Sequence, residues 1–336
     1  MQTLGARLIR SRLSVGLKRE RIELDDGDFL DLDWVAGRDG NGQRDNAPLV
    51  LLLHGLEGSA NSGYARQMYC ELSAKGLQAV GLNSRGCSGE PNRLPRAYHS
   101  GETGDLAYVL GVLRDRYPRR PLGAVGVSLG GNVLLKYLGE RDRQSQGRAG
   151  AVVRQTTDEE GKEGKENMGI AAAVAISVPF DLSAGADYME RGFSKTYRAF
   201  LVRKLQRKVR AKAGIMDGKV DISRALAART FREFDDAVIV PIHGFEDAED
   251  YYQCSSSAQF LESITTPTLL VHSLDDPFLP PAAVPTGIAS NNPHVRTEFT
   301  RSGGHVGFVS GHPWAPLFWG ERRAAEFLAE QLAGIS

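Results

Sequence analysis

A serine lies among closely spaced glycines in the segment GAVGVSLGGN, residues 123–132. Ser128 has a glycine two residues before it and another two residues after it, and a sharp strand-to-helix turn with this spacing exposes the serine hydroxyl. The apolar run 121–128 predicts the strand, and 129–140 predicts the helix. We therefore predict that Ser128 is a nucleophile, although an ordinary glycine-lined junction would show the same local pattern.

An acid and a histidine follow Ser128 in the chain order that such a nucleophile requires. The segment LLVHSLDDPFLP (269–280) ends a predicted strand in an Asp-Asp pair, and RSGGHVGF (301–308) carries His305 among glycines. His305 would accept the Ser128 proton and later return it to a leaving group. The three positions together predict acyl transfer by a serine, a histidine and an aspartate.

Either acid of the pair could orient His305. We predict Asp276, because Pro277 holds the residue before it in an extended conformation at the turn. Asp275 would then support the loop by accepting backbone N–H bonds, as aspartates in turns commonly do.

A His-Gly pair follows a predicted buried strand in LLLHGLEGS, residues 51–59. A loop at this place can supply one backbone N–H to a developing oxyanion, and the residue after the nucleophile can supply a second. The predicted donors are the amides of Leu56 and Leu129. His54 precedes the nucleophile in the chain, so we expect it to shape the loop rather than to act as the base.

Strand-like and helix-like segments alternate along most of the chain, which predicts an α/β fold with a mostly parallel sheet and helices on both faces. A hairpin is predicted at 21–34, strands at 47–55, 77–86, 121–128, 169–179 and 266–273, and a strand running into a loop at 295–305. Helices are predicted at 61–75, 102–117, 129–140 and 320–333.

The alternation stops at residues 181–260, which are mostly helical in pattern. We expect this block to be an inserted cap over the carboxyl edge of the sheet, where open α/β sheets bind ligands. The core would then comprise residues 1–180 and 261–336. The charged, glycine-interrupted stretch 154–169 is expected to be an exposed loop.

The composition excludes several function classes. The 336 residues carry 41 Lys and Arg and 41 Asp and Glu, and this balance does not suggest binding to nucleic acid. The three cysteines form no zinc spacing and no disulfide framework, and no Gly-x-Gly-x-x-Gly loop is present, so we expect no metal and no cofactor. The amino-terminal segment is a poor signal peptide, and no stretch has the length and apolar character of a membrane span. The odd number of scattered cysteines favours a reducing compartment, so a cytoplasmic location is expected.

Several long segments resemble the YheT-like α/β-hydrolases, a group of bacterial esterase-like proteins and eukaryotic lipid hydrolases. The matching segments are HGLEGSANSGY (54–64), NSRGCSGEPNRLPRAYHSG (83–101), GVSLGGNVLLKYLGE (126–140), SVPFDL (177–182), EFDD (233–236), HGFEDAEDYY (243–252), LDDPF (274–278) and GGHVGF (303–308). The resemblance implies the α/β-hydrolase fold and ester hydrolysis, with Ser128, Asp275 or Asp276, and His305 as the triad. It also implies a small-molecule ester or a lipid as substrate.

Other functions remain open on the sequence alone. A serine nucleophile also suits a thioesterase, a lipid hydrolase or an acyltransferase, and the fold can serve a non-enzymatic binding protein. The segment KTYRAFLVRKLQRKVRAK (195–212) carries eight Lys or Arg and no acid. Such a basic amphipathic helix can contact a membrane surface, or can simply pack as part of the cap.

Overall fold

An eight-stranded sheet forms the centre of the protein, for which a computed structural model describes residues 13–36, 46–151, 169–312 and 315–335. The strands lie in the order β1-β2-β4-β3-β5-β6-β7-β8. Their bounds are β1 (Leu17–Glu23), β2 (Phe29–Val35), β3 (Leu49–Leu53), β4 (Gln78–Asn83), β5 (Leu122–Val127), β6 (Ala172–Ile176), β7 (Thr268–Ser273) and β8 (Val295–Thr300). β1 and β2 pair antiparallel and the other six strands run parallel, which confirms the predicted fold class.

The central strands β3, β5 and β6 are buried along their whole length. Strands covered on both faces need apolar residues at every position, which is why short continuous apolar runs predicted them. The parallel register aligns Leu53 with Gly126 and Val127 with Ile176. The loops that follow these strands therefore emerge together at one edge of the sheet.

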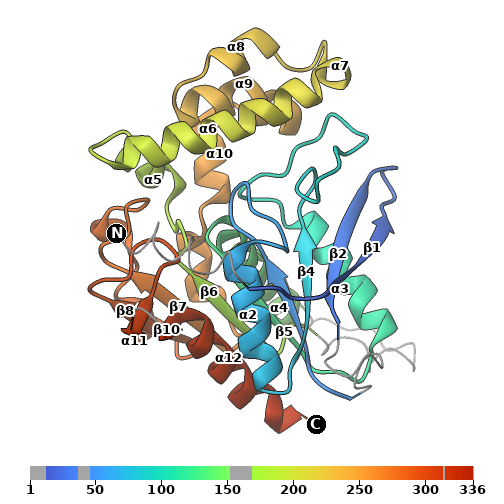
Figure 1. The fold of residues 1–336 in the computed structure, drawn as a ribbon, viewed down its shortest axis with the longest axis vertical. Helices are drawn as coiled ribbons and strands as arrows, with labels where there is room; N and C mark the ends of the chain where they lie inside the picture. The colour runs from blue at the N-terminus through green and yellow to red at the C-terminus, as the bar shows by residue number, and fades with distance from the viewer. Residues whose placement is uncertain (1–12, 37–45, 152–168, 313–314, 336) are drawn as a thin grey trace.

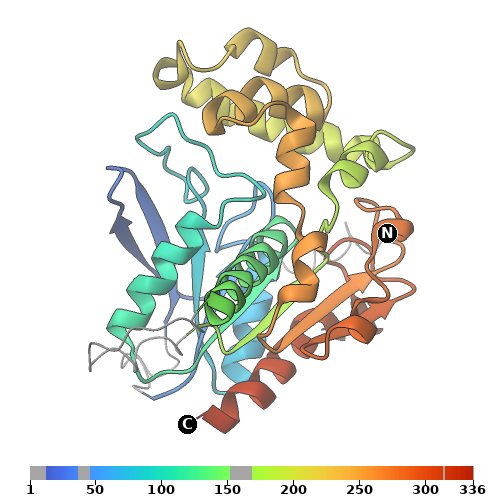
Figure 2. The same cartoon turned by 180° about the vertical axis from the view of Figure 1, so that it is seen from behind.

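Helices cover both faces of the sheet (Figures 1 and 2). On one face lie α2 (Gly63–Ala74) and α12 (Trp319–Leu332), and on the other lie α3 (Gly104–Arg116) and α4 (Leu129–Ala151). Shorter turns are η1 (Ser257–Ser263), which packs along α4, and η2 (Pro281–Ala283), α11 (Ile288–Asn291) and η3 (Ala333–Ile335).

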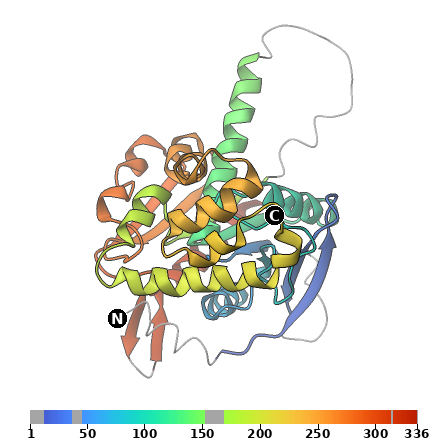
Figure 3. The same cartoon turned by 90° about the horizontal axis from the view of Figure 1, so that it is seen from above.

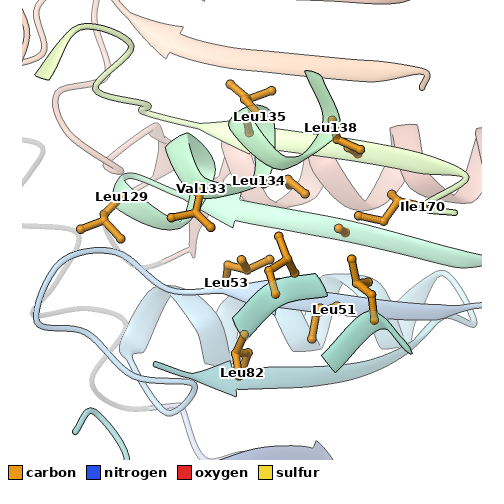
Figure 4. Packing of buried hydrophobic residues seen from close by; sticks show 14 of the residues in the cluster. Leu51, Leu53, Leu82, Leu129, Val133, Leu134, Leu135, Leu138 and Ile170 are labelled. Atoms are coloured by element: carbon orange, nitrogen blue, oxygen red, sulfur yellow. The ribbon is translucent and has the colours of Figure 1, made fainter. Parts of the chain in front are cut away.

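Leucines fill the space between β3 and α4 (Figure 4). Leu51 on the strand and Leu134 and Leu138 on the helix are fully buried. Burying a leucine side chain stabilises a fold by about 1.5–3 kcal/mol. This packing fixes α4, and with it the turn at the amino end of α4 that carries Ser128.

A helical layer lies above the carboxyl edge of the sheet (Figure 1) and is inserted between β6 and β7. It consists of α5 (Leu182–Tyr188), α6 (Ser194–Ala211), α7 (Ala213–Met216), α8 (Ile222–Ala227), α9 (Phe231–His243) and α10 (Ala248–Ser255). Thr230 and Glu233 form a capping box that begins α9. The layer has its own apolar cluster, which includes Phe234 and Tyr252. We call these helices the cap and keep 181–260 as its proposed bounds.

The structure differs from the predictions in two places. α4 extends to Ala151, beyond the predicted end at residue 140, because the continuation is rich in good helix formers although it has no apolar periodicity. A short hairpin of β9 (Val309–His312) and β10 (Ala315–Phe318) was not predicted, since its four-residue strands show no clear alternation. The predicted loop 154–169 lies outside the described residues except for Gly169.

Candidate active site

The turn after β5 holds Ser128 at the carboxyl edge of the sheet with a φ of 54°, in the left-handed region. Its backbone N–H donates to the Ile176 carbonyl at 2.8 Å. A Cβ at Gly130 would lie 2.5 Å from the Leu53 carbonyl oxygen, and a Cβ at Gly126 would lie 2.5 Å from the Gly130 carbonyl oxygen. Only glycine fits at both positions, so the spacing seen in the sequence follows from the tightness of this turn.

The structure brings Ser128, His305 and Asp276 into one hydrogen-bonded chain. His305 Nε2 lies 3.0 Å from Ser128 Oγ, and His305 Nδ1 lies 2.8 Å from Asp276 Oδ2. The other Asp276 oxygen accepts the Phe278 N–H at 2.8 Å. A carboxylate on Nδ1 keeps a proton there and leaves Nε2 free to accept the serine proton. The arrangement can therefore activate a serine hydroxyl.

Two contacts hold His305 and its loop in place. The Phe278 ring stacks on it with centroids 4.0 Å apart and an interplanar angle of 15°. The next residue, Val306, donates its N–H to Ser177 Oγ at 3.0 Å. Ser177 and Val306 have φ angles of 51° and 56°, so two unusual backbone conformations are joined beside the imidazole. This bond anchors the loop that carries His305.

Asp275 lies in the same loop but points to the backbone. Its Oδ1 accepts the Gly303 and Gly304 N–H groups at 2.9 and 2.7 Å and the Ser273 hydroxyl at 2.5 Å. Burial acts to raise the pKa of Asp275, but these hydrogen bonds outweigh it and hold the pKa below its ordinary value. Asp275 thus ties the end of β7 to the loop that leads to His305.

The loop after β3 carries Leu56, which lines the cavity. Tyr64 OH accepts the Gly55 N–H at 2.9 Å, and Tyr98 OH accepts the Glu57 N–H at 2.8 Å. The amide between them, that of Leu56, makes no hydrogen bond within the described part of the chain. The Leu56 N–H is therefore available to bind a ligand in the cavity.

The Leu129 amide is the second predicted oxyanion donor, and it directly follows Ser128 at the amino end of α4. Leu129 also lines the cavity, and among the described residues its N–H has no hydrogen-bond partner. A helix amino end carries partial positive charge from its aligned peptide dipoles. Both predicted donors therefore lie at the cavity, close to the proposed nucleophile.

A lysine from the cap reaches this same loop. Lys208 Nζ on α6 lies 2.7 Å from Glu57 Oε1 and 2.9 Å from Cys87 Sγ. Glu57 has a φ of 54°, and its carboxylate also accepts the Tyr98 hydroxyl at 3.0 Å. Burial raises the pKa of the Cys87 thiol. The ion pair joins the cap to the residue after Leu56.

Two further histidines near the site are neutral. His54 is buried, donates from Nδ1 to the Gly55 carbonyl at 2.8 Å and accepts the Ser84 N–H on Nε2 at 3.1 Å. Burial lowers its pKa to about 4, as expected for a residue that shapes the loop. His272 Nε2 lies 3.9 Å from Asp276 Oδ2, and burial lowers the pKa of His272 to about 4.

A cluster of His99, Glu102 and His243 has the residue types of a metal site, with ligand atoms within 4.8 Å of one another. Each residue is already engaged in a hydrogen bond. His99 Nδ1 accepts a backbone N–H, His243 Nε2 lies 2.9 Å from a backbone carbonyl, and Glu102 binds Arg96 at 2.6 Å. Burial lowers the pKa of His99 to about 3. The cluster connects the loop that contains His99 to the end of α9.

A cavity of about 740 Å³ opens above Ser128 and extends under the cap. Most of its walls are apolar, and the lining from the cap and nearby loops includes Leu182, Met189, Phe193, Tyr197, Phe200, Leu201, Leu205, Phe234, Ile239 and Phe278. One buried acid, Asp235, also lines it and accepts the Tyr252 hydroxyl at 2.7 Å. Burial raises the pKa of Asp235 to about 7.

Sequence reasoning missed the residues that support the site. Phe278 and Ser177 lie inside the motif segments LDDPF and SVPFDL, so their proximity to the predicted strand ends was a usable signal. Tyr64 and Tyr98 also lie in motif segments, but nothing local links a tyrosine to a distant amide. In the sequence, nothing distinguishes Lys208 from the other seven Lys and Arg residues of 195–212.

Comparison with known proteins adds three findings. A family model described as the alpha/beta hydrolase fold matches residues 48–311. YheT of Escherichia coli (strain K12) is 37% identical over 338 residues, covering 100% of this chain and 92% of that protein. Phospholipase ABHD3 of Homo sapiens is 30% identical over 313 residues, covering 92% of this chain and 71% of that protein.

The solved structure of the Pyrococcus furiosus esterase Pf2001 is similar in fold. The TM-score is 0.58 at 18% sequence identity, and the match covers 96% of this chain and 95% of that one. Within the described residues, no helix is both long enough and apolar enough to cross a membrane.

Proposed function

Because this chain belongs to the α/β hydrolase family, as its motif segments predicted, we propose that it cleaves carboxylic esters with Ser128, His305 and Asp276. The observation that carries the proposal is the hydrogen-bonded chain of these three side chains at the base of the cavity. YheT bears the name of an esterase and ABHD3 that of a phospholipase, which supports an ester or a lipid as substrate.

In the first half of the proposed reaction, Ser128 Oγ attacks the ester carbonyl carbon while His305 Nε2 accepts the hydroxyl proton. Asp276 stabilises the imidazolium that forms. The carbonyl oxygen becomes an oxyanion, which accepts hydrogen bonds from the Leu56 and Leu129 amides. The tetrahedral intermediate then collapses: the C–O bond breaks, and His305 donates its proton to the departing alcohol.

In the second half, water takes the place of the alcohol. His305 accepts a proton from that water, whose oxygen attacks the acyl-Ser128 carbonyl. Collapse of the second tetrahedral intermediate releases the carboxylic acid and returns the proton to Ser128. The substrate's acyl chain is accommodated by the apolar walls under the cap, since burying methylenes there is favourable.

The test combines a covalent probe with a substrate series. A fluorophosphonate probe is expected to label Ser128, as read by mass spectrometry of the labelled peptide. Ser62→Ala serves as a matched control, because Ser62 is another serine that lines the cavity and its hydroxyl accepts the Ser59 N–H instead of contacting the three proposed catalytic residues. Hydrolysis of p-nitrophenyl esters from short to long acyl chains then reports the acyl preference. Labelling at another serine, or none in folded protein, would contradict the proposal.

A further inference from the structure

The eight cations of residues 195–212 divide into two sets by the side of α6 on which they lie. Arg198, Lys204, Lys208 and Lys212 are held by partners: Arg198 pairs with Glu190, Lys208 pairs with Glu57, and Lys204 and Lys212 donate to backbone carbonyls. Lys195, Arg203, Arg207 and Arg210 are exposed. These four make no ion pair within the described residues, and α6 itself contains no acid.

Large apolar side chains are exposed beside the unpaired cations. Among the described residues, four large apolar side chains are exposed, and three of them lie on or next to α6. Phe193 (66% exposed) precedes α6, Phe200 (43%) lies on it, and Ile215 (45%) lies on α7 directly after it. Positions 200, 203, 207 and 210 follow the helical repeat and share one face. α6 runs along an outer side of the cap (Figures 1 and 3), so this face is open to a partner.

The same face reaches the substrate cavity. Phe193 and Phe200 line the cavity while remaining well exposed, so they lie where the cavity meets the surface. A partner that covers this face would also cover the cavity opening.

We propose that this face of α6 docks on an anionic lipid surface. The docking face comprises Phe193, Lys195, Phe200, Arg203, Arg207, Arg210 and Ile215. The cations would bind the headgroups while the apolar side chains enter the boundary with the acyl chains, as in interfacial helices. The proposal that this face docks on lipid is supported by the exposed side chains alone. Delivery of a lipid ester into the cavity rests in addition on the proposed function.

Charge and polarity favour a lipid surface over two other occupants. A second copy of the chain would place the same patch against itself in a two-fold dimer, and four unpaired cations would then face four others. A nucleic acid would satisfy the arginines but would leave Phe193, Phe200 and Ile215 exposed. An anionic bilayer can bind the cations through its headgroups and bury the apolar side chains among its acyl chains.

The experiment is co-sedimentation of the full chain with vesicles of phosphatidylcholine mixed with phosphatidylglycerol, compared with vesicles of phosphatidylcholine alone. Binding is expected for the anionic vesicles and should weaken as salt rises. Arg203→Gln, Arg207→Gln and Arg210→Gln combined should lower the partition coefficient about a hundredfold, at roughly fivefold for each charge. The matched control combines Lys18→Gln, Arg114→Gln and Arg119→Gln, which removes three exposed charges elsewhere and should leave binding unchanged.

Two readouts separate docking from catalysis. Vesicle binding is repeated with Ser128→Ala, which should bind like the parent chain, and turnover of a soluble short-chain ester is measured for both triple variants, which should match the parent. Equal binding to both vesicle types, or equal loss in the two triple variants, overturns the proposal. So does a concentration-dependent dimer, or tight binding to a DNA duplex, that is lost in the α6 variant while vesicle binding is not.

Discussion

The carboxyl edge of the sheet and the cap above it both line one cavity, but their residues are held in place by different means. At the edge, backbone geometry sets each position: Ser128 has a positive φ, and a Cβ at Gly130 would collide with the main chain. In the cap, side chains such as Phe200 and Leu205 line the cavity from helices. We therefore expect the edge to tolerate fewer changes of residue type than the cap.

This difference separates two kinds of effect. A substitution at the edge should remove the chemistry, and one in the cap should adjust which substrate fits or how stable the fold is. The following predictions run from the largest expected effect to the smallest.

The largest effect is expected for removing the proposed nucleophile at the carboxyl edge of the sheet. Ser128→Ala is expected to lower kcat by about three to six orders of magnitude, because it removes the hydroxyl that lies 3.0 Å from His305 Nε2. The protein should stay folded, since alanine keeps the Cβ and removes only the hydroxyl oxygen of a half-buried side chain. Ester hydrolysis and circular dichroism of the same preparation check both points. Near-normal turnover of Ser128→Ala in a clean preparation would show that Ser128 is not the nucleophile.

The two adjacent acids should differ in what they control. Asp276→Asn is expected to lower kcat by about four orders of magnitude at equal folded concentration, since Asp276 orients His305. Asp275→Asn should instead lower the melting temperature, because Asp275 holds the backbone of the loop. The low pKa of Asp275 contributes stability above its unfolded pKa, and this is lost as pH falls through the folded pKa. The reverse ranking of activities would reassign the orienting acid.

Asp235 in the cap should affect stability in a pH-dependent way. Its pKa is about 7 in the fold against 3.8 as the ordinary value, so the unfolded chain releases this proton first as pH rises. The folded state therefore loses stability from about pH 4 to about pH 7 on account of this group. Asp235→Asn should match the parent near pH 4 and exceed it near pH 8, by on the order of 2–4 kcal/mol. Urea denaturation at both pH values measures this, and parallel pH profiles would contradict it.

A smaller effect is expected for the cavity wall. Phe200→Ala should change the ratio of kcat/KM between long and short acyl esters by about tenfold or less, because it enlarges the cavity opening without touching the triad. Leu317→Ala is a suitable control, since Leu317 is an exposed apolar side chain that does not line the cavity. If several substitutions of cap residues that line the cavity left the preference for acyl length unchanged, the cap would have no role in substrate selection.

Features that depend on neighbouring residues could be predicted from the sequence, whereas features that depend on distant residues could not. The turn at Ser128 is encoded by the glycines on either side of it, so this position could be predicted. Short apolar runs predicted the parallel strands for the same reason. The hydrogen bonds of Tyr64 and Tyr98 with the loop after β3 join residues that only folding brings together. No periodic pattern in the sequence indicates these bonds.

Lys208 has a consequence for protein engineering. Because its ammonium group neutralises Glu57 beside the Leu56 amide, the cap is not an interchangeable module. A chimaera that receives a foreign cap without a cation at this place would leave the Glu57 carboxylate without its ion-pair partner, next to the residue whose amide is a proposed oxyanion donor. Grafts intended to alter substrate range should therefore carry Lys208 and Glu57 together, or replace both with an uncharged pair.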